Sequence, residues 1–259
     1  MSVGALASIA PSGSESSFCD SITRLSDRVD YQHADSAEQR DAIFRLRYQA
    51  YSRDGTISAN SFGRCSDSYD ETGDVYLLAL YVNDELASSI RLHVVSKQHP
   101  DFPSREVFAD VLQPELDAGK VVIDTTRFVA DERLSRVHRG LPYATFRLCI
   151  MAARYFGADY LLAAVAAEHQ AFYGRAFNHQ LICEPRPHPL LAKPISLMAL
   201  HCPTEAPKLY RRYPFLRSTF FERRMLFERP MAGPLQPGAR GEAEEDQPFA
   251  ELVAARTAG

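Results

Sequence analysis

The stretch VVIDTTRFVADERL, from Val121 to Leu134, decides the fold. Its first eight residues predict a strand bound for the interior, yet Asp124 and Arg127 stand in the middle of it. Charged side chains are rarely buried unless they are paired, because leaving water costs several kcal/mol per ion. Residues three apart in a regular strand face opposite sides of the sheet. Either each charge therefore pairs elsewhere, or a β-bulge redirects one of them.

The composition is that of a globular protein, and it argues against nucleic-acid binding and against a membrane-spanning helix. The chain has 259 residues, a formal net charge of -4 and 46% hydrophobic residues, enough for one large domain or two small ones. The mild acidity argues against nucleic acid, which is usually met by a basic surface. No apolar run reaches the roughly 18 residues of a membrane helix. The start of the chain lacks the features of a signal peptide, so we expect a cytoplasmic protein.

The cysteines argue against a metal site and against disulfides. Five cysteines are scattered through the chain, an odd number with no C-x-x-C pair. This pattern is typical of reduced, buried thiols in the cytoplasm, and we expect neither a zinc site nor any other bound metal.

The ends of the chain differ from its middle in composition. Residues 1–26 are rich in Ser, Gly and Ala and predict a disordered tail, and residues 229–259 predict a second, acidic tail rich in Pro and Gly. We expect one folded domain over residues 27–228, long enough to have a core of its own.

Strand and helix patterns alternate within that domain. Ser36 and Gln39 form the capping box of a helix, and residues 83–85 join two strands as a hairpin. The expected strands cover residues 28–34, 75–82, 86–95, 120–129, 159–166 and 195–202. The expected helices cover residues 37–55, 105–116, 141–156 and 168–177, the third ended by Gly157. This alternation indicates an α/β or α+β fold with a mixed sheet and helices on its faces.

Several charged residues lie at positions that are expected to be buried. Arg47 and Tyr51 are four apart and share one face of the first predicted helix. The other buried-looking charges are Asp67 and Asp70 in a loop, Arg91 in a hairpin strand, and Asp124 and Arg127. Two interpretations remain open: these groups form an ion-pair network that only holds the fold, or they form a functional site.

The order of these motifs resembles one enzyme family. R-x-x-x-Y, D-x-Y-D, I-R-L and D-x-T-R-F look like the acyl-homoserine-lactone synthases, and still more like the related N-acyl amino acid synthases of the GNAT superfamily. The helix with Phe172 and Tyr173 is similar to the FY-x-x-x-F helix of that superfamily. The resemblance implies a GNAT-like mixed central β-sheet, flanked by helices on both faces, with a bulged central strand. The lactone synthases carry a glutamate where this chain has Asp124.

The resemblance implies amide formation between an acyl thioester and the α-amine of an amino acid. Asp124 is then the first candidate for the general base and Asp70 the second. Arg91 or Arg127 binds the carboxylate of the amino acid, and an unpaired backbone N–H at a bulge holds the thioester oxygen. Tyr173 protonates the leaving thiolate. The residues expected to bind substrate are Arg47, Tyr51, Asp67, Arg91 and Phe128.

The expected acyl donor is acyl carrier protein, with its phosphopantetheine thioester as co-substrate and no bound cofactor. RVHRGLP only faintly matches the phosphate-cradling turn of acetyl-CoA-using GNATs, which fits a carrier-protein donor. Arg136, His138 and Arg139 are the expected carrier-binding residues, because carrier proteins are acidic. The run from Lys208 to Pro230 predicts either a peripheral contact with a membrane or the carrier, or a final helix and strand.

Three other functions remain open. A lactone synthase using S-adenosylmethionine is the nearest, although such enzymes usually show a tryptophan after the first helix and this chain has none. A catalytically silent GNAT-like binding module and an acetyl-CoA-dependent acetyltransferase are the others.

Overall fold

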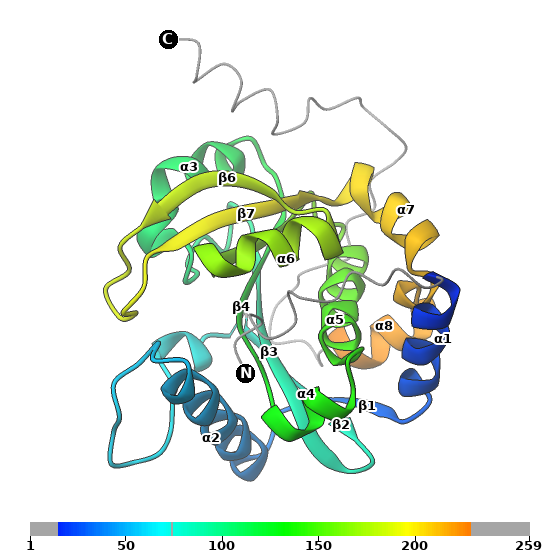
Figure 1. Ribbon diagram of the computed structural model, residues 1–259. Helices are drawn as coiled ribbons and strands as arrows, with labels where there is room; N and C mark the ends of the chain where they lie inside the picture. The colour runs from blue at the N-terminus through cyan, green and yellow to red at the C-terminus, as the bar shows by residue number, and fades with distance from the viewer. Residues whose placement is uncertain (1–14, 74, 229–259) are drawn as a thin grey trace.

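One mixed sheet organises the chain in the computed structural model, which describes residues 15–73 and 75–228 (Figure 1). Its seven strands lie in the order β1-β2-β3-β4-β5-β7-β6, and β4 with β5 is the parallel pair. The strands are β1 (Val29–His33), β2 (Val75–Val82), β3 (Glu85–Val95), β4 (Val122–Ala130), β5 (Tyr160–Ala166), β6 (Gln180–Arg186) and β7 (Ile195–His201).

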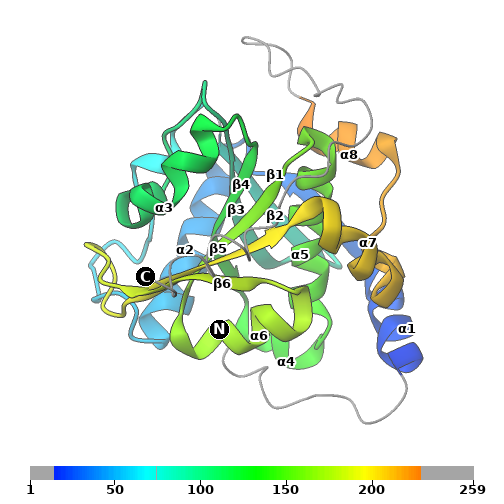
Figure 2. The same ribbon diagram turned by 90° about the horizontal axis from the view of Figure 1, so that it is seen from above.

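Helices cover both faces of this sheet, as Figure 2 shows from above. One face carries α2 (Ala37–Arg53) and α3 (Arg105–Asp117). The other carries α1 (Glu15–Ser26), α5 (Leu141–Phe156), α6 (Ala167–Phe177), α7 (Cys202–Arg212) and α8 (Phe220–Phe227). The short elements are η2 (Ser68–Asp70), α4 (Glu132–Val137) and η3 (Pro214–Leu216). The predicted mixed sheet with helices on both faces is confirmed.

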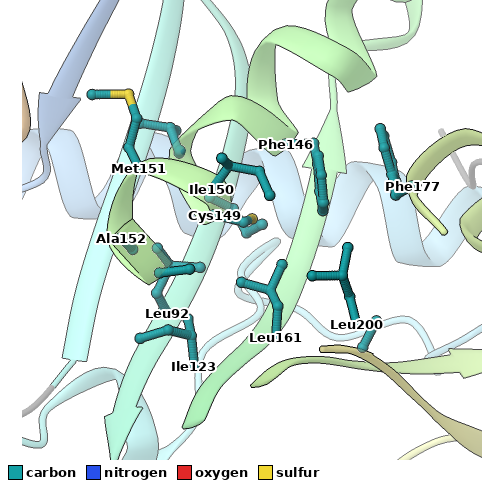
Figure 3. Packing of buried hydrophobic residues seen from close by; sticks show 14 of the residues in the cluster. Leu92, Ile123, Phe146, Cys149, Ile150, Met151, Ala152, Leu161, Phe177 and Leu200 are labelled. Atoms are coloured by element: carbon teal, nitrogen blue, oxygen red, sulfur yellow. The ribbon is translucent and has the colours of Figure 1, made fainter. Parts of the chain in front are cut away.

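The main core lies under α5. Figure 3 shows side chains from α5 meeting those of β3, β4, β5 and β7, and the rings of Phe146 and Phe177 stack with their centres 3.7 Å apart. A second cluster lies under α3 on the opposite face, around Phe102, Phe108 and Leu162. Burying large apolar side chains on both faces contributes roughly 1.5–3 kcal/mol for each side chain.

Local signals in the sequence set most element boundaries. Ser36 caps α2 and forms the predicted capping box with Gln39. Asn83 and Asp84 both have positive φ, at 49° and 67°, the conformation of a two-residue hairpin turn between β2 and β3. Gly157 ends α5 at φ 63°.

A β-bulge on β4 explains how this strand accommodates both Asp124 and Arg127. Ser89 pairs with Val129 and Arg91 with Thr126, so β4 has one residue more than β3 between these pairs. Arg127 adopts φ 56° within the extra segment, a conformation that non-glycine residues rarely take. Its side chain reaches Asp67 on the α2–α3 side. A bulge thus redirects Arg127, and each of the two charges also has a partner of its own, so both expectations are met.

Strands β4 and β5 separate beyond their first residues. Their pairing runs from Val122–Tyr160 to Thr125–Ala163, while β4 continues to Ala130 and β5 to Ala166. The edges that face each other past this point carry no ladder between them, and this opens the sheet beside the bulge.

The N-terminal boundary of the domain was predicted wrongly. Residues 15–26 form α1 instead of belonging to a tail, because Phe18, Ile22 and Leu25 recur at helical spacing. Ile22 is fully buried and packs over Gly140, just before α5. Residues 1–14 and the acidic tail at 229–259 lie outside the described residues.

The final segment was also predicted incompletely. Residues 220–227 form a helix and not a strand, because Thr219 and Glu222 make a capping box at its start. Strand β6 was not predicted, since its residues alternate poorly and are half-buried or exposed. None of the helices in the described ranges is long and apolar enough to cross a membrane.

Ile22→Ala tests the corrected N-terminal boundary. Because Ile22 is 0% exposed, we expect the variant to lose about 2–5 kcal/mol in the free energy of unfolding, measured by urea denaturation. Ser21→Ala, an exposed position on the same helix, is the matched control and is expected to change it by less than about 0.5 kcal/mol. Equal effects of the two changes would contradict the docking of α1.

Candidate active site

An alternating row of charges crosses the face of the sheet that α2 and α3 cover. Arg47 Nη1 donates to both oxygens of the Asp70 carboxylate at 2.8 and 2.9 Å. Arg91 Nη1 lies 3.0 Å from Asp70 Oδ1 and also pairs with Asp67. Asp67 Oδ2 accepts a hydrogen bond from Arg127 Nη2 at 2.6 Å. We call these five residues the charged row; its three guanidinium groups and two carboxylates leave one net positive charge.

A single turn of η2 directs both carboxylates into the row. Asp67 Oδ1 accepts the N–H of Tyr69 at 3.0 Å, and Asp70 Oδ2 accepts the N–H of Asp67 at 3.0 Å. The D-x-Y-D spacing is thus a reciprocal capping box that places two carboxylates on one side of the loop.

The carboxylates of the charged row stay ionised at neutral pH. Burial alone raises the pKa of Asp70, but Arg47 and Arg91 outweigh it and hold that pKa below its ordinary value. Arg91 and Arg127 lower the pKa of Asp67 against burial in the same way. A carboxylate of this kind is a weak proton acceptor, so the predicted role of Asp70 as second-choice base is poorly matched to its environment.

Asp124 lies apart from the charged row. Its side chain is 0% exposed, and both carboxylate oxygens are held by Ser104, at the start of α3. The Ser104 hydroxyl donates to Oδ1 at 2.6 Å and the Ser104 N–H donates to Oδ2 at 3.1 Å. Burial raises the pKa of Asp124, opposed by these hydrogen bonds and by Arg91. The two charges on β4 therefore have different partners.

A cleft of about 210 Å³ opens where β4 and β5 separate. Polar side chains from α2, η2 and the bulge form one wall, and residues 164–166 at the end of β5 form an apolar floor. The cleft lining includes Tyr51, Asp67, Arg91, Ser104, Glu106, Arg127, Phe128, Ala164, Val165, Glu168, His169, Tyr173, His188, Leu191 and Lys193.

Six of the predicted site residues line this cleft: Tyr51, Asp67, Arg91, Arg127, Phe128 and Tyr173. Arg47, Asp70 and Asp124 lie behind its polar wall. The guanidinium of Arg127 lies 5.5 Å from the ring centre of Tyr51, so α2 meets the bulge through this contact. Tyr173 lies in the second half of α6.

The predicted carrier-binding residues lie outside the cleft lining, in α4 and the turn before α5. Arg136 pairs with Glu132, and the neighbouring Arg133 pairs with Glu85. Burial, with a contribution from Arg28, lowers the pKa of His138. The positive charge of this surface is therefore smaller than the sequence alone suggested.

The predicted site residues did not include several polar residues of the cleft: Ser104, Glu106, Glu168, His169, His188 and Lys193. Lys193 donates to Glu168 at 2.6 Å, and the N–H of Ala192 donates to Thr56 at 3.2 Å, which ties the β6–β7 loop to the end of α2. These are contacts between distant segments, and only the pairing of Glu168 with His169 at a helix start had a local signal. Within the described ranges, no group of three or more His, Cys, Asp or Glu side chains forms a metal site.

Comparison with known proteins places this geometry in a family. The family model described as N-acyl amino acid synthase FeeM matches residues 42–201, which is more than half of the chain and contains the whole charged row. No curated protein matches the sequence.

Several solved structures share the fold. FeeM, an N-acyl amino acid synthase from uncultured soil microbes, is 19% identical with a TM-score of 0.60, over 71% of this chain and 97% of that chain. The coenzyme A-dependent acyl-homoserine lactone synthase BjaI is 14% identical with a TM-score of 0.52, over 73% of this chain and 89% of that chain. The lactone synthase LasI is 12% identical with a TM-score of 0.51, over 66% and 89%. At such identities, the likeness to these structures shows the fold alone.

Asp70→Asn tests the energetic role of the charged row. Arg47 is 0% exposed, and its Nε and Nη2 find no hydrogen-bond partner among the described residues, so loss of the Asp70 charge leaves a buried cation uncompensated. We expect a loss of about 3–5 kcal/mol in the free energy of unfolding at pH 7. Asp110→Asn, which breaks the exposed pair with Arg186, is the control and is expected to cost less than about 1 kcal/mol.

The same pair of variants gives a pH signature. Since the folded-state pKa of Asp70 is lowered, its stabilisation is complete above the unfolded pKa of about 3.9 and is lost as the pH falls toward the folded value. The difference between wild type and Asp70→Asn is therefore expected to shrink in urea titrations below about pH 4. A difference that stays constant with pH would show that packing and not charge is responsible.

Proposed function

This chain belongs to the FeeM family of N-acyl amino acid synthases and is an acyltransferase, and we propose that it joins a fatty acyl group from acyl carrier protein to the α-amine of an amino acid. The observation that carries this proposal is the cleft between β4 and β5, which combines a cationic wall with an apolar floor. The carboxylate of an amino acid fits the cationic wall, and an acyl chain fits the apolar floor.

Arg127 is the proposed anchor for the carboxylate of the amino acid. Its Nε and Nη2 donate to Asp67 at 3.2 and 2.6 Å, and this fixes the plane of the guanidinium. Its Nη1 has no hydrogen-bond partner among the described residues and remains for an incoming anion. Arg91 is less suited, since its Nε donates to Thr126 at 3.0 Å and its Nη1 serves both Asp67 and Asp70.

The bulge supplies the proposed site for the thioester carbonyl. Arg127 and Phe128 have no register partner on β3, and β4 beyond Thr125 has none on β5. Backbone N–H groups that are released from the ladder are suitable donors to an oxyanion, because they are already oriented before charge develops. The amine then attacks the carbonyl carbon, and the C–S bond breaks to leave a thiolate.

Tyr173 is the proposed acid for that thiolate. It lines the cleft, and burial together with nearby Cys149 and Tyr51 raises its pKa, so the phenol keeps its proton at neutral pH. A protonated phenol at the cleft can give a proton to the sulfur as the C–S bond breaks, and the tyrosinate is then reprotonated by the proton that the nitrogen loses as the amide forms.

The start of α5 favours a carrier protein over coenzyme A as the donor. Phosphates bind at helix starts through free backbone N–H groups. Here Leu141 N–H donates to His138 at 2.9 Å, Pro142 has no N–H, and both Tyr143 and Ala144 donate to Gly140 at 3.0 Å. A Cβ at Gly140 would lie 2.7 Å from Ile22, so α1 also covers this turn. Few backbone N–H groups therefore remain at the start of α5 to bind a pyrophosphate.

The carrier is proposed to dock near α4 and the turn before α5, where Arg136, His138 and Arg139 lie. Part of this charge is neutralised by Glu132 and Glu85, so docking there depends on fewer free cations than the sequence suggests. The exposed side chains of Phe220, Phe221 and Met225 on α8 are the surface that fits the predicted peripheral contact with a membrane.

The first test is mass spectrometry of the purified protein with fatty acyl carrier proteins of several chain lengths and a pool of amino acids. We expect an N-acyl amino acid, with the matching acyl-coenzyme A thioesters at least about tenfold poorer in kcat/KM. Arg127→Ala is expected to lower kcat/KM for the amino acid about 10- to 150-fold, the value of a charge-assisted hydrogen bond. Arg45→Ala, an exposed arginine of α2, is the control.

Three outcomes would contradict the proposal. A product that requires S-adenosylmethionine would identify a lactone synthase. Equal use of coenzyme A thioesters would overturn the carrier as the preferred donor. No product with any pair from a folded protein would point to a binding module without turnover.

Tyr173→Phe tests the leaving-group acid. Removing the hydroxyl is expected to lower kcat about 10²-fold or more while the KM for the amino acid stays within about twofold. Tyr155→Phe, which changes a half-buried tyrosine outside the cleft lining, is the control. Full activity of Tyr173→Phe would assign the proton to another group.

A further inference from the structure

Asp124 has the burial of a functional acid but no access to the cleft. It is 0% exposed and does not line the cleft, so it cannot touch an acceptor amine directly. Ser104 lies between them: it lines the cleft while its hydroxyl donates to Asp124 Oδ1 at 2.6 Å.

Ser104 makes an unusual contact for its place in the fold. It is the residue before α3, where a serine hydroxyl commonly accepts a hydrogen bond from the first turn of the helix. Here its side chain makes no capping hydrogen bond. Both its hydroxyl and its N–H are instead spent on the carboxylate of Asp124. Because the hydroxyl donates inward, its oxygen lone pairs remain to accept a proton from the cleft.

Resting on the proposed function, we propose that Ser104 relays the proton of the acceptor ammonium to Asp124. One N–H bond of the ammonium breaks as a new O–H bond forms on Ser104 Oγ. The original Ser104 O–H bond breaks as its proton moves to Asp124 Oδ1. The amine is then neutral and nucleophilic, Ser104 is unchanged, and Asp124 is a neutral acid that returns its proton to solvent after the product leaves.

The electrostatics around Asp124 support this direction of transfer. Burial raises its pKa, the hydrogen bonds from Ser104 and the charge of Arg91 oppose this, and the net pKa lies above the ordinary value. His93, its register partner on β3, has its pKa lowered by burial and by Arg91 to about 4 and so is neutral near pH 7. The register partner on β5 is the apolar Leu162, and the nearest acid of α3 at the cleft is Glu106.

Other acids and bases of the cleft are less suited than Asp124 to accept the proton of the ammonium. The pKa of Asp67 is held down by two arginines, and Lys193 with a backbone hydrogen bond lowers the pKa of Glu168. Burial lowers the pKa of His169 and of His188, although nearby acids oppose it. Among the carboxyl groups described here with a clear shift, Asp124 is the one whose pKa moves toward neutrality.

The test compares steady-state kinetics of wild type, Ser104→Ala, Ser104→Thr, Asp124→Asn and the Ser104→Ala/Asp124→Asn double variant, with acyl carrier protein as donor, from about pH 6 to about pH 10. Ser104→Ala is expected to lower kcat about 10²-fold near pH 7 with the KM of the donor unchanged. Ser104→Thr, which keeps the hydroxyl, is expected to restore most of the rate. The double variant is expected to be no slower than the slower single variant, because the two groups act as one unit.

The pH profile separates a relay from a structural role. At high pH the amine arrives already deprotonated, so the deficit of Ser104→Ala and Asp124→Asn is expected to shrink, whereas a damaged fold would keep it constant. Ser26→Ala removes a half-buried serine hydroxyl of α1, which donates to the backbone carbonyl of Ile22 at 3.0 Å outside the cleft lining, and is the control with full activity expected.

Three results would overturn the relay. They are a kcat of Ser104→Ala within about twofold of wild type, effects of the two single variants that multiply in the double variant, and a deficit that does not change with pH. In each case the wild type still forms the amide, so the proposed function stands. A wild type that forms no amide removes the proposed function and the relay together.

Discussion

Alternation of charge along Arg47, Asp70, Arg91, Asp67 and Arg127 is the interaction on which the rest of the site depends. Each buried guanidinium has a carboxylate beside it, and each carboxylate lies between two guanidinium groups, so the desolvation cost of every ion is offset from its neighbours. The row joins α2, η2, β3 and β4. It therefore holds together four segments that no single apolar cluster connects, and it ends at the cleft.

The end of the charged row gives the cleft its cationic wall. Because three cations face two anions, the row has a surplus of positive charge, and the bulge delivers its last member, Arg127, to the cleft. The strained φ of Arg127 is compatible with this role, since strained backbone persists where surrounding contacts over-determine it. Asp67 and Tyr51 supply those contacts. The same bulge leaves backbone groups of β4 without ladder partners, so the proposed carboxylate site and the proposed carbonyl site have one structural origin.

Sequence reasoning succeeded where signals were local. The capping box at Ser36 and the hairpin at Asn83 both rest on residues close in the chain. It failed at β6, which forms because the distant strand β7 pairs with it. It also failed at α1, where the Ser-, Gly- and Ala-rich composition of residues 1–26 was given more weight than the helical spacing of Phe18, Ile22 and Leu25. It named Asp124 as a candidate base but did not name Ser104, since no spacing in the sequence predicts a hydrogen bond between these residues 20 apart.

The short junction between β4 and β5 divides the sheet into two consecutive parts of the chain. Strands β1 to β4 come from residues before 131 and strands β5 to β7 from residues after 159, and four register pairs join them. Each part supplies one wall of the cleft: the charged row comes from the first, and the apolar floor with Tyr173 from the second. A chain cut in the turn before α5 would thus give two fragments, neither with a complete site, whose recovered activity would report directly on reassembly of the half-sheets.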